Sequence, residues 1–163
     1  MDLTVTPART HGDGFSLIGV TRTVIHMLEG WLAPLLDLAL RLWVAAAFFQ
    51  SGLTKIMSWD TTLALFENEY SVPLLPPTLA AYVGTFTELF FPVLLVLGLG
   101  TRFAAAVLFV FNIVAVVSYG DLSEAGLMQH QYWGLLLLVT LLHGPGAISV
   151  DHFIRRYFWR KGA

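Results

Sequence analysis

The chain contains no cysteine and few charged residues. Without cysteine, the chain acting alone cannot form disulfides, supply a thiolate nucleophile, or bind iron–sulfur clusters or other metals through thiolates. Charged residues make up 12% of the sequence and hydrophobic residues 56%. An ordinary soluble domain has about 25% charged and roughly 45–50% apolar residues. The composition is therefore that of an integral membrane protein.

Four apolar segments are each long enough to cross a bilayer, which takes about 20 residues of α-helix. They cover about residues 31–57, 78–100, 101–119 and 128–148. The polar connections between them are short, and we find no second domain and no repeat longer than a helix. We therefore predict an all-α membrane protein, a four-transmembrane-helix up-down bundle.

Two shorter helices are predicted outside these spans. In residues 1–30, apolar residues recur at helical spacing, which fits an N-terminal interfacial helix; a partly disordered tail fits the same stretch. The loop at 58–77 can form a short amphipathic outer-loop helix capped by Ser58 or Asp60. Its apolar face would carry Leu63, Phe66 and Tyr70. We interpret this loop as a lid over the outer mouth of the bundle.

Positive charge is distributed unevenly along the chain. Most basic residues fall in the N-terminal segment, the second connection or the tail: Arg9, Arg22, Arg102, Arg155, Arg156, Arg160 and Lys161. An up-down bundle places these three segments on one side, and Lys55 is the basic residue expected on the other. Because basic loops remain in the cytoplasm, we predict that both termini are cytoplasmic. We expect the tail to bind lipid headgroups rather than nucleic acid.

These features divide the chain into three parts. Residues 1–30 form a cytoplasmic or interfacial segment, 31–150 the transmembrane domain, and 151–163 a basic cytoplasmic tail.

Glu88 stands near the middle of the second predicted span, where an ionised side chain costs about 2.5–3.5 kcal/mol on insertion scales. It must pair with a cation or take up a proton. Arg41 is the cation considered first, because it follows Asp37 by one helical turn and its guanidinium can bond several groups. We predict that Asp37, Arg41 and Glu88 form the polar centre of the bundle.

Three interpretations of this centre stay open. The network could be structural and fix only the register of the helices. Alternatively, Glu88 could accept a proton or a hydrogen bond from a ligand that enters from the bilayer. In a third arrangement, Arg41 extends to the cytoplasmic headgroups and leaves Glu88 protonated.

Four other polar residues lie at depths where a ligand site could use them: Gln50, Lys55, Asn112 and His130. We expect Lys55 and His130 to act from the outer side, with Asn112 behind them. Haem binding is not expected, because His130 and His143 are thirteen residues apart on one helix, roughly 20 Å, and cannot share an iron. A second copy of the chain could supply missing ligands. No metal site is predicted.

The stretches "RLWVAAAFFQSGLTKI", "GTFTELFFPVLLVLGLGTRFAA" and "GPGAISVD" resemble the DoxX family of four-helix bacterial membrane proteins. The resemblance covers about residues 38–152, with Ala45 where many relatives carry glycine. The motif elements fall on Arg41, Phe48, Gly52, Lys55, Glu88, Gly98, Thr101 and Arg102.

The resemblance implies a multi-pass protein of the bacterial inner membrane. The family name comes from a subunit type of thiosulfate:quinone oxidoreductase, and other members are described in membrane redox or oxidative-stress complexes. The stretch "SWDTTLALFENEYSVPLLPPTLAAYVGT" is similar to a branch encoded beside enzymes that modify copper-binding peptides.

Two main functional hypotheses follow. In the first, the protein is the membrane subunit of a redox system and binds quinone as a cofactor, with Arg41 and Glu88 at the quinone head. In the second, it is a non-enzymatic scaffold or accessory protein in copper or metal stress, and the polar centre is structural. A carrier of protons or small solutes fits less well, because the chain has no internal inverted repeat. The expected partners are the lipid bilayer, quinone, proteins of a redox or metal-stress complex, and a second copy of the chain.

Overall fold

The computed structural model describes residues 17–161. The helices are α1 (Leu17–Met27), the π-helical turn η1 (Leu28–Leu32), α2 (Ala33–Met57), α3 (Trp59–Asn68), α4 (Pro77–Leu97), α5 (Thr101–Ser118), α6 (Glu124–His143) and α7 (Val150–Lys161). Within these described residues the only β structure is one isolated bridge between Tyr70 and Tyr119. The prediction of an all-α membrane protein is confirmed.

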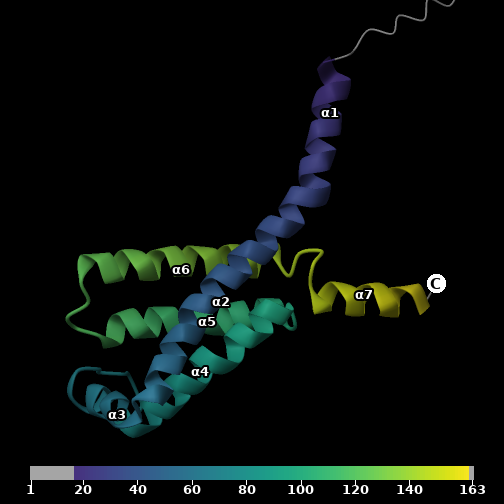
Figure 1. The fold of residues 1–163 in the computed structure, drawn as a ribbon. Coiled ribbons are helices and arrows are strands. Elements are labelled where there is room, and N and C mark those ends of the chain that lie inside the picture. Colours follow the sequence, from purple (N-terminus) through teal and green to yellow (C-terminus); the bar gives the residue numbers. More distant parts are fainter. Residues whose placement is uncertain (1–16, 162–163) are drawn as a thin grey trace, which may run out of the picture.

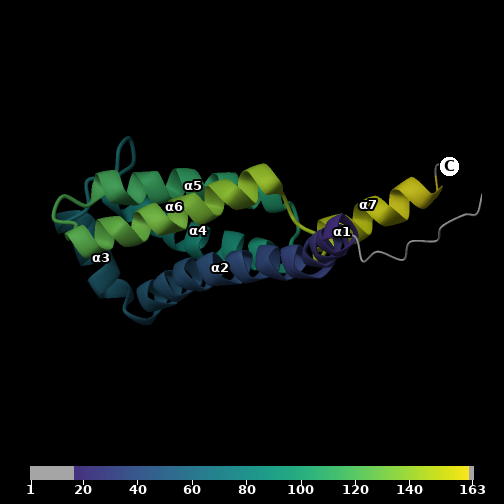
Figure 2. The ribbon, with the colours of Figure 1, turned by 90° about the horizontal axis from the view of Figure 1, so that it is seen from above.

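Helices α2, α4, α5 and α6 run in alternating directions and form one bundle (Figure 1). Helix α4 packs against α2 and α5, and α6 packs against α5 and α2. Seen from above, α5 and α6 lie on one side of the bundle and α2 lies on the other (Figure 2). This is the up-down arrangement that short connections favour.

The core of the bundle combines large apolar residues with alanines. Its buried members are Val44, Ala45, Phe48, Leu95, Ala104, Ala105, Leu108 and Leu137. The small side chains let neighbouring helices approach closely, which is how membrane helices associate when water supplies no driving force. Helix α4 also contains Pro92, which is buried within the bundle.

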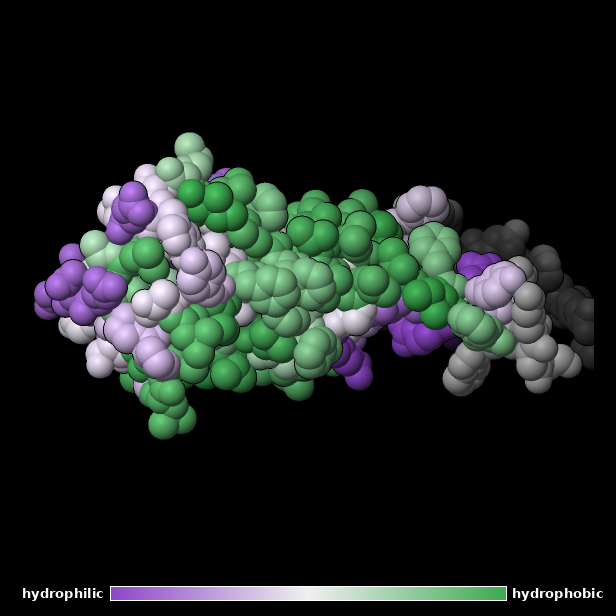
Figure 3. Space-filling model, turned by 90° about the horizontal axis from the view of Figure 1, so that it is seen from below, coloured by the Kyte–Doolittle hydropathy of each residue, from purple (hydrophilic) through white to green (hydrophobic). Residues whose placement is uncertain are grey.

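Three helical segments of the described chain are long and apolar enough to cross a membrane: Gly19–Met57, Pro77–Leu97 and Thr101–Ser118. Helix α6 has 20 residues and packs beside α5, but Gln129, His130 and Gln131 make its first half more polar. The count of four spans therefore stays a prediction. Figure 3 shows apolar residues covering the middle of the molecule, with hydrophilic residues gathered towards both ends.

The N-terminal helix is continuous with the first span. Residues Gly19–Met57 form one helical run of 39 residues, and residues 19–32 are exposed. The helix predicted in this region exists, but the boundary predicted between residues 30 and 31 falls inside η1, where the helix does not break. Helix α1 projects beyond the bundle (Figure 1), and its position in the membrane interface stays a prediction. Residues 1–16, including Arg9, lie outside the described residues.

The predicted outer-loop helix is present as α3. Phe66 is buried against Ala80 and Ala81 of α4, and Leu63 and Tyr70 pack beside it, as the amphipathic pattern predicts. The capping prediction is wrong. Ser58 occupies the N-cap position, but its side chain makes no capping bond, and Asp60 lies inside the first turn.

Helices α1 and α7 leave the bundle at the end where the α4–α5 turn lies (Figures 1 and 2). We call this the inner end of the bundle. The opposite end, which carries α3 and the α5–α6 connection, is called the outer end. The N-terminal segment, the second connection and the tail thus share one end, as the charge distribution indicates. Their location in the cytoplasm stays a prediction.

Candidate functional site

The partner of Glu88 is Lys55, on the last turn of α2. Lys55 Nζ donates hydrogen bonds to Glu88 Oε2 at 2.6 Å and to Oε1 at 2.8 Å. Ser51, one turn earlier on α2, donates to Glu88 Oε1 at 3.1 Å and accepts from Lys55 Nζ at 2.9 Å. The side chains of Lys55 and Glu88 are 18% and 7% exposed. A cation and a hydroxyl therefore compensate the buried carboxylate.

Gly52 permits the close approach of α2 and α4 at this pair. A Cβ atom at Gly52 would lie 2.8 Å from Leu89 Cγ and 3.1 Å from Glu88 Cβ. Any larger residue would separate the two helices here, and the ion pair would lengthen.

The predicted contact between Arg41 and Glu88 is wrong. Arg41 lies at the inner end of the bundle and is 1% exposed. Its Nη1 donates to the carbonyl of Leu95 at 3.0 Å, its Nη2 to the carbonyl of Ile148, and its Nε to the carbonyl of Asp37 at 3.3 Å. Lys55 is fourteen residues beyond Arg41, roughly 21 Å along the helix at about 1.5 Å per residue. Because α4 runs antiparallel to α2, Glu88 lies level with Lys55, and Leu95 lies level with Arg41.

The predicted pairing of Asp37 with Arg41 is also wrong. Arg41 bonds the backbone of Asp37, and the two side chains form no salt bridge within 4.0 Å among the described residues. The Asp37 carboxylate instead contacts His143 Nδ1 at 2.8 Å. Asp37 therefore links α2 to the end of α6 at the inner end of the bundle.

Asp151, at the start of α7, completes this inner junction. Its carboxylate accepts hydrogen bonds from Gly100 N and Thr101 N, each at 2.9 Å, and from Thr101 Oγ1 at 3.0 Å. Its own N–H donates to the carbonyl of Gly98 at 2.9 Å. A side-chain Cβ at Gly98, where φ is +67°, would lie 2.6 Å from Arg41 Nη1. At Gly98 the α4–α5 turn is thus packed tightly against Arg41 and against Ser149, which directly precedes α7.

Burial and hydrogen bonding act in opposite directions on Asp151. Partial burial raises the pKa of its carboxyl group. The hydrogen bonds from Thr101 and Gly100, together with the charge of Arg155, lower that pKa by more than burial raises it. The net pKa lies below the ordinary value of 3.8, so Asp151 is ionised at neutral pH and caps α5 as an anion.

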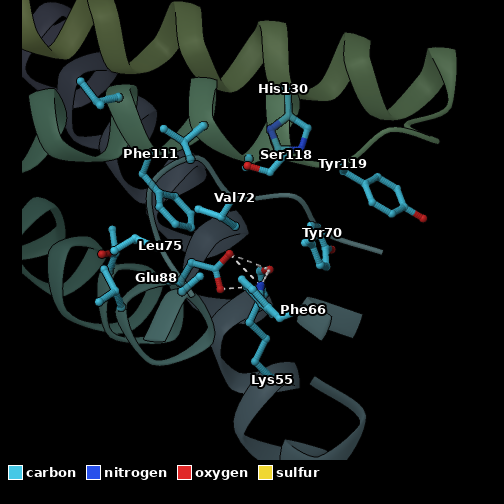
Figure 4. Close-up of a pocket in the computed structure, with 18 of the residues that line it drawn as sticks. Lys55, Phe66, Tyr70, Val72, Leu75, Glu88, Phe111, Ser118, Tyr119 and His130 are labelled. Carbon is cyan, nitrogen blue, oxygen red and sulfur yellow. Dashed lines mark hydrogen bonds and ion pairs between the residues drawn. The ribbon is translucent and has the colours of Figure 1, made fainter. Parts of the chain in front are cut away.

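The Lys55–Glu88 pair borders a cavity of about 440 Å³ at the outer end. Figure 4 shows Glu88 and Lys55 on one side of this space and Ser118 and His130 on the other. The polar lining residues are Ser51, Lys55, Tyr70, Thr87, Glu88, Ser118, Tyr119 and His130. The remaining walls are apolar and include Phe66, Val72, Leu75 and Phe111.

The segment that follows α3 closes the outer side of this cavity. Ser71 N donates to the carbonyl of Ser118 at 2.8 Å, beside the bridge between Tyr70 and Tyr119. The ring of Tyr70 lies 4.8 Å from that of Phe66 and 5.1 Å from that of Tyr119. Burial, and then the neighbouring Tyr119, Glu88 and Glu69, raise the pKa of Tyr70 above its ordinary 10.0. Tyr70 is therefore a neutral phenol at this position, and a role of the segment as a lid stays a prediction.

Ser118 is the cavity residue whose polar group lacks a partner. It is 2% exposed, and its hydroxyl makes no hydrogen bond with any described residue. An unsatisfied buried hydroxyl costs about 1–3 kcal/mol, so such groups in native proteins call for an explanation. The hydroxyl oxygen has less than 1 Å² of accessible surface, so a ligand oxygen in the cavity would satisfy it only after the Ser118 side chain turned to another rotamer.

Asn112 fixes the hydrogen-bonding role of His130. Asn112 Nδ2 donates to the backbone carbonyl of His130 at 2.9 Å, and Asn112 Oδ1 lies 2.7 Å from His130 Nδ1. Because a carbonyl can only accept, the amide nitrogen must face it, and Oδ1 must accept from the ring. The proton of a neutral His130 is therefore on Nδ1, and Nε2 is an acceptor. Asn112 thus stands behind His130, as expected from the sequence.

Two sequence-derived expectations about the cavity differ from the geometry. Gln50 is exposed and does not line the cavity, because it lies on another face of α2 from Ser51 and Lys55. The sequence also places Ser51 at a usable depth in the outer half of the first span, and Ser51 lines the cavity one helical turn before Lys55. Sequence reasoning missed Ser118 and Tyr119 as lining residues.

Comparisons with known proteins place the chain in a family. The DoxX family profile matches residues 36–121, more than half of the 163 residues. A Haemophilus influenzae protein described as "Uncharacterized protein" is 30% identical over 131 residues, which cover 76% of this chain and 86% of the relative. Inner membrane protein YphA of Escherichia coli strain K12 is 34% identical over 134 residues, which cover 75% and 92%. No solved structure matches this chain. The chain belongs to the DoxX family and is an integral membrane protein.

Proposed function

We propose that this protein is the membrane subunit of an inner-membrane redox system and binds a quinone or quinol in the outer-end cavity. The observation that carries the proposal is the cavity of about 440 Å³ that the buried Lys55–Glu88 pair borders. Small-molecule sites typically enclose roughly 300–1,000 Å³ and combine apolar walls with a few polar groups. This cavity has both properties.

The lining matches the chemistry of a quinone ring. Phe66, Phe111 and Tyr70 supply aromatic walls for an apolar ring. Quinone oxygens accept hydrogen bonds, which Lys55 Nζ could donate in exchange for one of its three bonds to Ser51 and Glu88, and which the Ser118 hydroxyl could donate after a rotamer change. Quinol hydroxyls donate hydrogen bonds, which the Nε2 atom of His130 can accept. The site therefore offers partners to both redox forms.

The residues of this chain would handle protons, while a bound quinone would supply the electron-accepting chemistry. Reduction of a quinone to a quinol consumes two protons, and Glu88 and His130 are the lining groups able to exchange them. Since the chain has no cysteine, we expect a partner protein to deliver the electrons. Arg41 and Asp37 have no part in this proposal, because they lie at the inner junction.

Ser118→Ala provides the sharpest test. The protein would be purified without delipidation, its quinone content measured by mass spectrometry, and a short-chain quinone titrated in nanodiscs. Loss of one hydrogen bond, worth about 1 kcal/mol, should weaken binding roughly five- to tenfold. The ligand-free protein should become slightly more stable, because an unsatisfied hydroxyl has been removed.

Gln50→Leu is the matched control, since Gln50 lies on the same helix as Lys55 but outside the cavity. It should retain wild-type quinone content and affinity, whereas Glu88→Gln should lose several-fold. Negligible quinone in wild type, or equal affinity in wild type and Ser118→Ala, would refute the proposal. If Glu88→Gln then lowered stability alone, the pair would be structural, and the accessory role in metal stress would be the remaining hypothesis.

A further inference from the structure

We propose that the inner end of the bundle holds the headgroup of an anionic phospholipid, with Arg102 of α5 and Arg155 of α7 as its cationic ligands. The site is separate from the quinone cavity, and the proposal does not depend on quinone binding.

A second cavity, of about 520 Å³, lies between the first turn of α5, the loop after α6, and α7. Arg102 and Arg155 both line it, and His143 and His152 add ring nitrogens to the same lining. Arginine stays charged at any physiological pH, and its planar donor fork matches the oxygens of a phosphate. Two such residues line this cavity from different helices.

The protein itself leaves much of this donor capacity unused. Arg102 Nη2 donates to the carbonyl of Leu142 at 3.3 Å, which accounts for one of its five N–H groups. Asp151 also lines the cavity and lowers its net charge, but its oxygens accept from Gly100 and Thr101. No salt bridge to Arg155 is found among the described residues. A phosphate would supply the acceptors that the chain does not.

The surroundings favour a lipid over free phosphate. Phe103 and Ile154 line the same cavity and are 66% and 42% exposed. Further along α7, Phe153, Tyr157 and Phe158 are also exposed, a pattern typical of a helix in the membrane interface. The cavity lies at the inner end, beyond the apolar middle of the molecule seen in Figure 3. An occupant with an anionic headgroup and acyl chains would contact both kinds of residue.

The test compares Arg155 with its neighbour Arg156, which is also exposed on α7 but does not line the cavity. Thermal unfolding of the full-length protein would be followed in detergent with added phosphatidylglycerol, phosphatidylcholine or inorganic phosphate. Phosphatidylglycerol should raise the unfolding temperature of wild type and Arg156→Gln by several degrees. Arg102→Gln and Arg155→Gln should lose at least half of that shift, and neither phosphatidylcholine nor phosphate should reproduce it.

Three results would overturn the proposal. An equal loss in Arg156→Gln would mean that diffuse positive charge attracts the lipid. Equal stabilisation by phosphatidylcholine would remove the role of lipid charge, and equal stabilisation by inorganic phosphate would mean that no lipid is required. If a glutamine variant fails to accumulate, native mass spectrometry of the wild type decides, because a site requires bound phosphatidylglycerol in preference to phosphatidylcholine.

Discussion

At the outer end of the bundle, Lys55 and Glu88 neutralise each other beside a cavity, whereas at the inner end Arg41 is enclosed by backbone. Both ends bury charge within a membrane protein, which is costly unless every charged group finds partners. Arg41 bonds the carbonyls of three separate segments and is thereby committed to holding them together. The outer pair borders open volume, so a ligand can reach its groups.

The residues that carry the family resemblance divide between these two ends. Gly52, Lys55 and Glu88 belong to the outer pair. Gly98 and Thr101 belong with Arg41 and Asp151 to the inner junction. The motif residues thus include one group that holds the inner end of the fold together and a second group that borders a cavity.

Arg41→Met should have the largest effect on stability, because it removes the hydrogen bonds that hold α2, α4 and the loop after α6 together at the inner end. The carbonyls of Leu95 and Ile148 would lose a buried donor, at about 1–3 kcal/mol each, so we expect a destabilisation of about 2–6 kcal/mol. Chemical unfolding in detergent would measure it. Protein that still folds should keep wild-type quinone affinity. A variant of normal stability that lost quinone would contradict the division between the two ends.

A double-mutant cycle on the outer pair should show a smaller and reversible effect. Lys55→Met leaves Glu88 without its cation but keeps the bond from Ser51, and because Lys55 is partly exposed the loss should cost about 2 kcal/mol. Adding Glu88→Gln should recover most of that loss, because no buried charge remains. The double variant should therefore be nearly as stable as wild type but should not retain quinone. Purely additive stability losses in the cycle would show that the two groups are not coupled.

Asp151→Asn should have the smallest effect, about 1 kcal/mol, as expected for a weakened helix cap. The difference from wild type should depend on pH. Because the pKa of Asp151 in the folded protein is below 3.8, its stabilising effect is complete above that pH and disappears as the pH falls through the lowered value. Unfolding of both proteins at pH 7 and near pH 2 would measure this. A difference that stays constant over this range would rule out a capping role for the charged form.

Composition and hydrophobic run length were sufficient to predict the class of fold. The spans at 78–100 and 101–119 correspond closely to Pro77–Leu97 and Thr101–Ser118, because apolar runs separated by glycines leave few alternatives. The same run length could not show that the first helix extends back to Leu17 as one continuous element. Residues 17–30 are mixed in polarity, and such a segment can continue a helix or end it.

The sequence was sufficient to predict the buried acid of the site, Glu88, but not the residue that pairs with it, Lys55. The burial cost of a carboxylate identified Glu88 from sequence alone. Choosing Arg41 depended on depths counted within each span, and the first helix passes far enough beyond the bundle to move Arg41 to the inner end. Lys55, at the end of its helix, has a long side chain that reaches back to Glu88. Ser118 and Tyr119 join the cavity only through tertiary packing, which leaves no local signal in the sequence.

Pro92 has a consequence for the backbone at Glu88. A proline at position 92 has no N–H, so the carbonyl four residues earlier, that of Glu88, cannot receive its usual helical bond. The turn of α4 that presents the carboxylate therefore lacks one backbone hydrogen bond, and a proline is a common position for a helix to bend. Bending at this turn would change the separation between Glu88 and Lys55 while the packed inner half stayed in place.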